Sequence, residues 1–209
     1  MTNISPGHVL QLCKKLSRAN GILSKLRHNA PRNVCLQVYY ALFYSHLIYG
    51  CNLWGFTSEE NIKKIEVLQR KCVRILTFSD FQSHSNPLFI QLGLIKARDI
   101  IKSQQLKLVF DYLSGSLPDD LNVLFTLNSV VHEHDNRHSE YLLHLPEIQT
   151  TTYGNKSINF HCPSVWNSTV RQGIPITANK SGPIETIHNA IHLKKTLKKH
   201  FLYSYSLEE

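Results

Sequence analysis

The sequence predicts a mainly α-helical protein, with a helical bundle followed by a smaller mixed α/β C-terminal region with short strands. Three observations lead to this fold class. Apolar residues recur at three- and four-residue spacing through most of residues 1–127, which is the period of a helix packed on one side. Glycine and proline separate these segments. After residue 127 the period fades, so we place a helical domain at 1–127 and a C-terminal extension at 128–209.

The first two predicted helices differ in how much of their surface is apolar. The helix at residues 6–28 has one apolar stripe, which includes Leu16 and Leu23. The second helix is expected to begin at Pro31, and its residues 34–48 are apolar almost all round, as expected of a buried helix. Its aromatic residues could stack on nucleic-acid bases, but its apolar character favours core packing. The aromatic residues of this region are Tyr39, Tyr40, Phe43, Tyr44, Tyr49 and Trp54.

The remaining elements are marked by local signals at their ends. Residues 57–60 have the pattern of a capping box before a helix that extends to about residue 76. Further helices are expected at 85–93, at 96–113, from Pro118 and at 184–203, with a helical turn at 163–170. Short strands are expected at 141–145 and 156–161, and a loop at 171–183.

The charge of the chain favours a polyanionic partner. Lys and Arg outnumber Asp and Glu by 23 to 15, for a net charge of +8. Two helices each gather basic residues within about 40° of the helix circumference. These candidate nucleic-acid-binding residues are Lys14, Arg18 and Lys25 in the first helix, and Lys63, Arg70 and Arg74 in the third, with Lys71 beside them. A charged helix face can equally be a solvated surface without a ligand.

No pattern in the sequence indicates an active site or a cofactor. The five cysteines are odd in number and form no C-x-x-C pair, so reduced thiols are expected, as in an intracellular chain. Zinc-ligand types gather late in the chain without the tight paired spacing of zinc sites, and Asp119–Asp120 suits a helix start better than magnesium. That set is His132, His134, His138, His144, His161 and Cys162. G-x-S-x-G, H-E-x-x-H and P-loop motifs are absent from the sequence.

Membrane insertion and secretion are not expected either. No run of about 18 apolar residues occurs. Residues 1–17 carry lysines but neither an apolar stretch nor a small-residue cleavage pattern. We therefore expect an intracellular protein without a membrane partner, in either cytoplasm or nucleus.

Several ordered motifs resemble the region just beyond the polymerase palm of non-LTR (LINE-type, jockey-like) retrotransposon reverse transcriptases. The resemblance extends in order over nearly the whole chain. It is carried by Lys15-Leu16-x-Arg18-Ala19-x-Gly21-Ile22-Leu23-x-Lys25-Leu26-Arg27, Tyr49-Gly50-x-x-x-Trp54-Gly55, Leu68-Gln69-Arg70-Lys71-Cys72-Val73-Arg74, Pro87-Leu88-Phe89, Leu92-Gly93-Leu94, Leu117-Pro118, Asn136-Arg137, Pro163-x-x-Trp166-Asn167-Ser168 and Leu193-Lys194-Lys195.

The resemblance implies a thumb domain and its C-terminal extension. The palm motifs of the family, including its aromatic-Ala-Asp-Asp turn, do not occur here, so no catalytic residue is carried over. The family usually has Gly where Cys162 stands, and the region of Asp135 to Arg137 is one residue shorter than its counterpart. A thumb would hold RNA or an RNA–DNA template–primer duplex through phosphates, independently of sequence, without polymerase activity of its own.

Two further hypotheses stay open from the sequence. The chain could be a helical interaction module, or a decayed pseudogene product, with no nucleic-acid role. It could also be a histidine-dependent metalloenzyme, which the spacing of the histidines disfavours.

Overall fold

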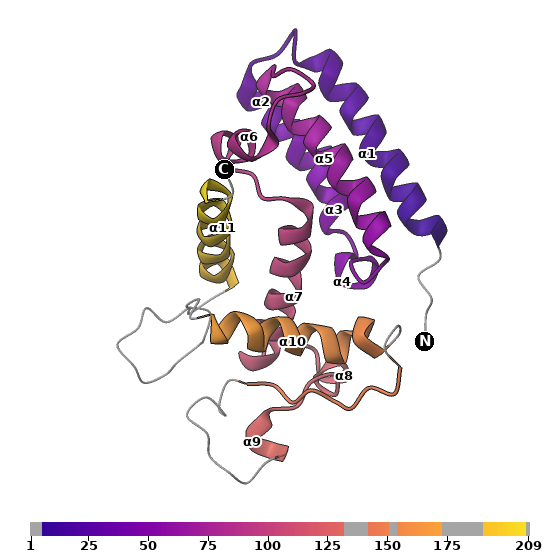
Figure 1. The fold of residues 1–209 in the computed structure, drawn as a ribbon, viewed down its shortest axis with the longest axis vertical. Helices are drawn as coiled ribbons and strands as arrows, with labels where there is room; N and C mark the ends of the chain where they lie inside the picture. The colour runs from indigo at the N-terminus through magenta and orange to yellow at the C-terminus, as the bar shows by residue number, and fades with distance from the viewer. Residues whose placement is uncertain (1–5, 132–141, 151–153, 173–189, 208–209) are drawn as a thin grey trace. The chain divides into compact units, whose positions relative to one another are not determined.

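The computed structural model describes residues 6–131, 142–150, 154–172 and 190–207, and these residues are mainly helical (Figure 1). The mainly helical class expected from the sequence is therefore confirmed. The helices are α1 (Pro6–Leu26), α2 (Arg32–Val38), the π-helical η1 (Tyr39–Tyr44), α3 (Ser45–Ile48), α4 (Cys51–Trp54), α5 (Glu59–Thr77), α6 (Ser85–Leu92), α7 (Ala97–Leu113), α8 (Asp119–Asn122), α9 (Asn128–Val131), the 3-10 helix η2 (Gly154–Lys156), α10 (Ile158–Arg171) and α11 (Ala190–Ser206).

The chain forms two compact units. Unit 1 contains Met1–Ile101 and Phe201–Glu209, and unit 2 contains Lys102–His200. The units therefore divide inside α7, whereas the sequence pattern changes at residues 127/128. Three histidines of the zinc-like set (132, 134 and 138), most of the expected loop at 171–183 and residues 184–189 of the last expected helix lie outside the described residues.

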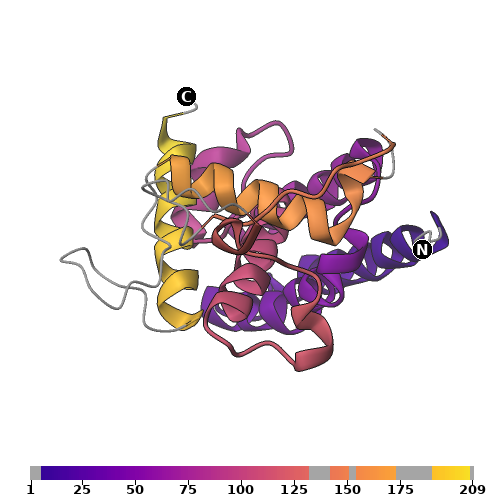
Figure 2. The ribbon, with the colours of Figure 1, turned by 90° about the horizontal axis from the view of Figure 1, so that it is seen from below.

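Unit 1 is built around α1 and α5, which lie side by side in both views (Figure 1, Figure 2). The Asn20 side-chain amide donates to the carbonyl of Leu68 at 2.9 Å, and Arg27 Nη1 donates to that of Ile75 at 3.4 Å. Both pairs are 48 residues apart in sequence, so the two helices run in the same direction in a fixed register. Their apolar stripes meet the core, where Leu16 and Ile65 are fully buried.

The expected apolar helix forms as α2, η1 and α3 in direct succession. The π-helical stretch buries Tyr39 and Phe43, whose rings stack with centroids 5.4 Å apart. Core packing is therefore confirmed for Tyr39, Phe43 and the buried Trp54, whereas Tyr40 and Tyr49 are exposed.

The start of α5 differs from the expected capping box. The N-cap residue is Ser58, and its side chain makes no capping hydrogen bond. Because the helix begins at Glu59, Glu60 is its second residue and not the third, which a capping box requires. The hydroxyl of Thr57 instead accepts a 2.9 Å hydrogen bond from the side-chain amide of Asn61.

The expected mixed α/β C-terminal region was predicted wrongly, because the described residues of unit 2 are helical or irregular and contain no strand. Residues 142–145 contain only an isolated bridge between Leu143 and Leu127, and residues 158–161 begin α10. The side chain of Asn167 takes both backbone groups of Leu143, with Nδ2 donating to the carbonyl at 2.8 Å and Oδ1 accepting from the amide at 3.0 Å. The backbone groups of Leu143 that could bond a neighbouring strand bond the side chain of Asn167 instead. No strand forms in the described part of the chain.

The core of unit 2 explains why residues 158–161 are helical. Cys162, Trp166 and Thr169 are buried at the three- and four-residue spacing of a helix, which continues the pattern begun at Ile158. Other buried apolar residues of the unit are Leu106, Val109, Phe110, Phe125, Leu193 and Leu197. The β-branched and aromatic residues of the segment 156–161 therefore serve helix packing.

Candidate nucleic-acid interface

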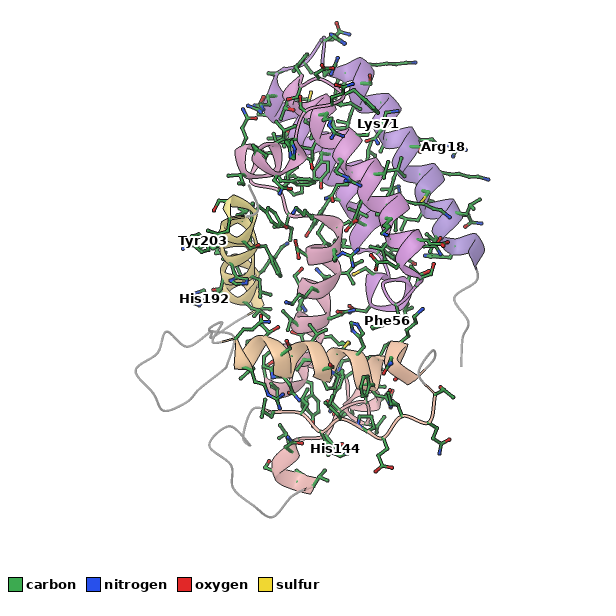
Figure 3. All side chains as sticks on the ribbon, viewed as in Figure 1. Arg18, Phe56, Lys71, His144, His192 and Tyr203 are labelled. Atoms are coloured by element: carbon green, nitrogen blue, oxygen red, sulfur yellow. The ribbon has the colours of Figure 1, made fainter. Side chains whose placement is uncertain are left out.

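The exposed sides of α1 and α5 carry six of the seven basic residues predicted from the sequence. The inner sides of both helices are apolar and buried, so the helical period turns the basic positions toward solvent. Figure 3 labels Arg18 on α1 and Lys71 on α5. We call the following six exposed residues the cationic face: Lys14, Arg18 and Lys25 of α1, and Lys63, Arg70 and Lys71 of α5.

The parallel register brings the two basic rows to the same height. With an offset of 48 residues, Lys14 lies level with Ile62 and Lys25 with Val73, so the α5 residues fall within the same stretch. Eleven residues of helix rise about 16 Å. One strand of a duplex carries about five phosphate charges over that length, at about 3.4 Å each.

Two of the three acidic residues of α5 are paired with a residue outside the cationic face. Arg98 of α7 donates to both carboxylate oxygens of Glu59, and its Nε lies 3.1 Å from Glu66 Oε1. This fork lowers the pKa of Glu59 through the hydrogen bond and raises that of Arg98. None of the six residues of the cationic face forms an ion pair with another described residue. Their charges are therefore available to an external anion.

Arg74 is the predicted site residue that the structure places differently. Its side chain is half-buried, and its Nε and Nη2 donate to the carbonyl of Ser83 at 3.0 and 2.9 Å. The guanidinium also lies 5.9 Å from the centre of the Phe81 ring. Arg74 thus fixes the loop after α5, a role that helix periodicity does not reveal.

Arg27, which ends the first motif of the family resemblance, is a cationic residue near this surface that was not among the predicted site residues. It follows the last residue of α1, and its guanidinium carbon lies 4.9 Å from the centre of the Phe78 ring. A second signal is its position one helical turn after the buried Leu23.

Unit 1 also contains a cavity of about 340 Å³ beside α5. Arg70, Ser85 and Lys96 are among its lining residues, together with Asp99 and Tyr205. The Tyr205 hydroxyl donates to the Asp99 carboxylate and accepts from the backbone amide of Lys96 at 2.9 Å, so these groups hold the wall of the cavity together.

The described residues offer no obvious chemistry of their own. No three of the described His, Cys, Asp and Glu side chains gather to form a possible metal site. Burial raises the pKa of the Cys51 thiol to about 12 and also raises that of Cys72, so both are protonated near neutral pH and poorly nucleophilic. No described helix has the length and apolarity to cross a membrane.

Comparison with known proteins finds no match to any protein-family model, curated protein or solved structure. The resemblance to LINE-type reverse transcriptases therefore stays a prediction from the sequence motifs.

Proposed function

We propose that this chain is a nucleic-acid-binding part of a retrotransposon reverse transcriptase, without polymerase activity of its own. The observation that carries the proposal is the cationic face, where two parallel helices present six exposed cations without ion-pair partners among the described residues. Such a face attracts a phosphate backbone at long range and gains affinity by releasing counterions.

The chemistry of the face favours binding that is independent of sequence. Lysine ammonium groups on flexible stems contact phosphates as point charges and do not read base edges. RNA or an RNA–DNA duplex is the partner that the resemblance implies, and a thumb domain must accept any sequence in that duplex.

A helical interaction module remains a second candidate, and it has an observation in its favour. Unit 1 exposes several apolar side chains on neighbouring elements, including Tyr40, Ile48, Tyr49 and Leu53. Exposed apolar groups of this kind can mark a protein-binding surface. This candidate predicts stable folding with no salt-sensitive affinity for nucleic acid.

Salt-dependent binding tests the first candidate. Fluorescence anisotropy with a blunt 12-base-pair RNA–DNA duplex, measured between 50 and 200 mM salt, should give a log–log slope of about −4 to −5 for about five phosphate contacts. The triple variant Lys63→Gln, Arg70→Gln, Lys71→Gln should bind more weakly and reduce the slope to about −1 to −2. Gln keeps a similar helix propensity, so α5 should remain intact.

A second triple variant provides the matched control. Lys156→Gln, Lys195→Gln and Lys199→Gln remove the same three charges from exposed positions outside the cationic face. Its slope should stay close to that of the unmodified chain. Equal slopes for the two triple variants would contradict the proposal, because binding would then follow net charge and not the cationic face.

A further inference from the structure

The loop after α5 exposes two phenylalanine rings close together in sequence. Phe78 has 57% of its surface exposed, and Phe81 has 76%. Phe78 is the C-cap residue of α5 with φ +56°, a left-handed conformation that favours glycine and is uncommon for a bulky residue. Neither burial nor the backbone preference of the residue therefore explains the large apolar side chain of Phe78.

Cationic and aromatic neighbours hold both rings. The Arg27 guanidinium lies 4.9 Å from the centre of Phe78, and the His28 ring meets Phe78 edge-on at 5.9 Å with an interplanar angle of 86°. Arg74, fixed by its two hydrogen bonds to the Ser83 carbonyl, lies 5.9 Å from the centre of Phe81. A guanidinium therefore lies over each ring and orients it, while more than half of the surface of each phenylalanine stays exposed.

Phe78 continues the cationic face at one end. Phe78 follows Lys71 by seven residues, or about two helical turns, so it lies on the same side of α5 about 10 Å further along. Its contacts with Arg27 and His28 show that it also meets the end of α1. A strand lying along the cationic face toward the end of α5 would thus reach Phe78, and Phe81 follows three residues later in the chain.

We propose that Phe78 and Phe81 form a stacking site for unpaired nucleobases. The proposal rests on the proposed function and specifies its substrate as a duplex with a single-stranded extension. Flat aromatic rings beside guanidinium groups are typical of sites that stack unpaired bases without reading sequence. Bases inside a duplex are covered by their neighbours, so only the extension would occupy the site.

Binding to extended and blunt duplexes tests the stacking site. The probe is the 12-base-pair RNA–DNA duplex, either blunt or with a four-nucleotide extension at one end or the other, and with 2-aminopurine in the extension. One extended duplex should bind at least about fivefold more tightly than the blunt duplex, since each stacked base adds about that factor or more. Its 2-aminopurine fluorescence should be quenched on binding.

Variants separate the rings from the cationic face. Phe78→Gly with Phe81→Ala should remove both the quenching and the advantage of the extended duplex, while affinity for the blunt duplex stays unchanged. Phe78→Tyr with Phe81→Tyr keeps both rings and should retain the advantage. Glycine suits the positive φ of residue 78, so Phe78→Gly alone should leave the thermal unfolding midpoint unchanged or raise it.

The possible outcomes distinguish the two proposals. Equal binding of blunt and extended duplexes, without quenching, overturns the stacking site and leaves the rings as a surface for protein contacts. A lower unfolding midpoint for Phe78→Gly also counts against it, because the ring would then serve the fold. If the blunt duplex does not bind but the extension is still quenched, the cationic face fails while the stacking site stands.

Discussion

The buried amide of Gln69 provides the sharpest test of how unit 1 is held together. Its side chain is 1% exposed and makes three hydrogen bonds. Nε2 donates to the carbonyl of Ile95 at 2.9 Å and to the hydroxyl of Tyr39 at 3.3 Å, and Oε1 accepts from the amide of Ala97 at 2.6 Å. One residue of α5 thereby links the π-helical stretch to the start of α7.

The substitution Gln69→Leu should cost about 3–6 kcal/mol of unfolding free energy. It leaves three buried polar groups without partners, at about 1–3 kcal/mol each, and a leucine of similar size recovers part of the loss. This is a large share of the 5–15 kcal/mol that typically stabilises a domain. Denaturant unfolding followed by circular dichroism at 222 nm measures the change, provided that the slope with denaturant is unaltered.

Two controls make the Gln69 prediction specific. Gln105 in unit 2 is 2% exposed, and its Nε2 has no hydrogen-bond partner among the described residues, so Gln105→Leu should be neutral or stabilising. Adding Tyr39→Phe to Gln69→Leu removes one of the stranded groups and should recover about 1 kcal/mol. A loss below about 1 kcal/mol for Gln69→Leu, or an equal loss for Gln105→Leu, would refute the hydrogen-bond argument.

Two other changes should affect stability in ways that the structure defines. Asn167→Ala removes both hydrogen bonds to Leu143, so it should cost about 2–4 kcal/mol and make residues 142–150 sensitive to limited proteolysis; resistance equal to that of the unmodified chain would contradict this. Burial raises the pKa of Cys51 from about 9 to about 12, so the folded state holds a proton that the unfolded state releases. The contribution of this thiol to the free energy of unfolding is therefore fully present below about pH 9 and is lost as the pH rises toward 12. Thermal midpoints measured across that range should fall less steeply for Cys51→Ala, and identical slopes would rule the thiol out as the cause.

The sequence predicted correctly those helices that have both a recognisable end signal and an apolar stripe at helical spacing. The apolar period predicted α1 and α5, and Gly93, with φ +60°, is the C-cap of α6 at the end of the helix expected at 85–93. The segment 156–161 was predicted wrongly because its aromatic and β-branched residues suit a strand when taken alone. Its helical pattern becomes visible only with the buried Trp166 and Thr169 further along the chain.

The candidate site was only partly predictable, because its arrangement depends on contacts between distant residues. Periodicity placed Lys14 and Arg70 on exposed helix faces, as the structure also does. The register between α1 and α5 depends on hydrogen bonds across 48 residues, which no local pattern contains. The diversion of Arg74 to the Ser83 carbonyl and the left-handed conformation of Phe78 both depend on the path of the loop after α5.

The parallel direction of α1 and α5 determines when the first helix can find its partner during synthesis. Helices that run the same way cannot be joined by a tight hairpin, so the chain from Arg27 to Ser58 must cross back before α5 begins. In a nascent chain η1 and α3 can contact α1 before α5 has been made, so only the part of the apolar stripe that α5 covers stays exposed until Thr77 has left the ribosome. A product truncated before Glu59 would therefore expose that part of the stripe to chaperones or to aggregation.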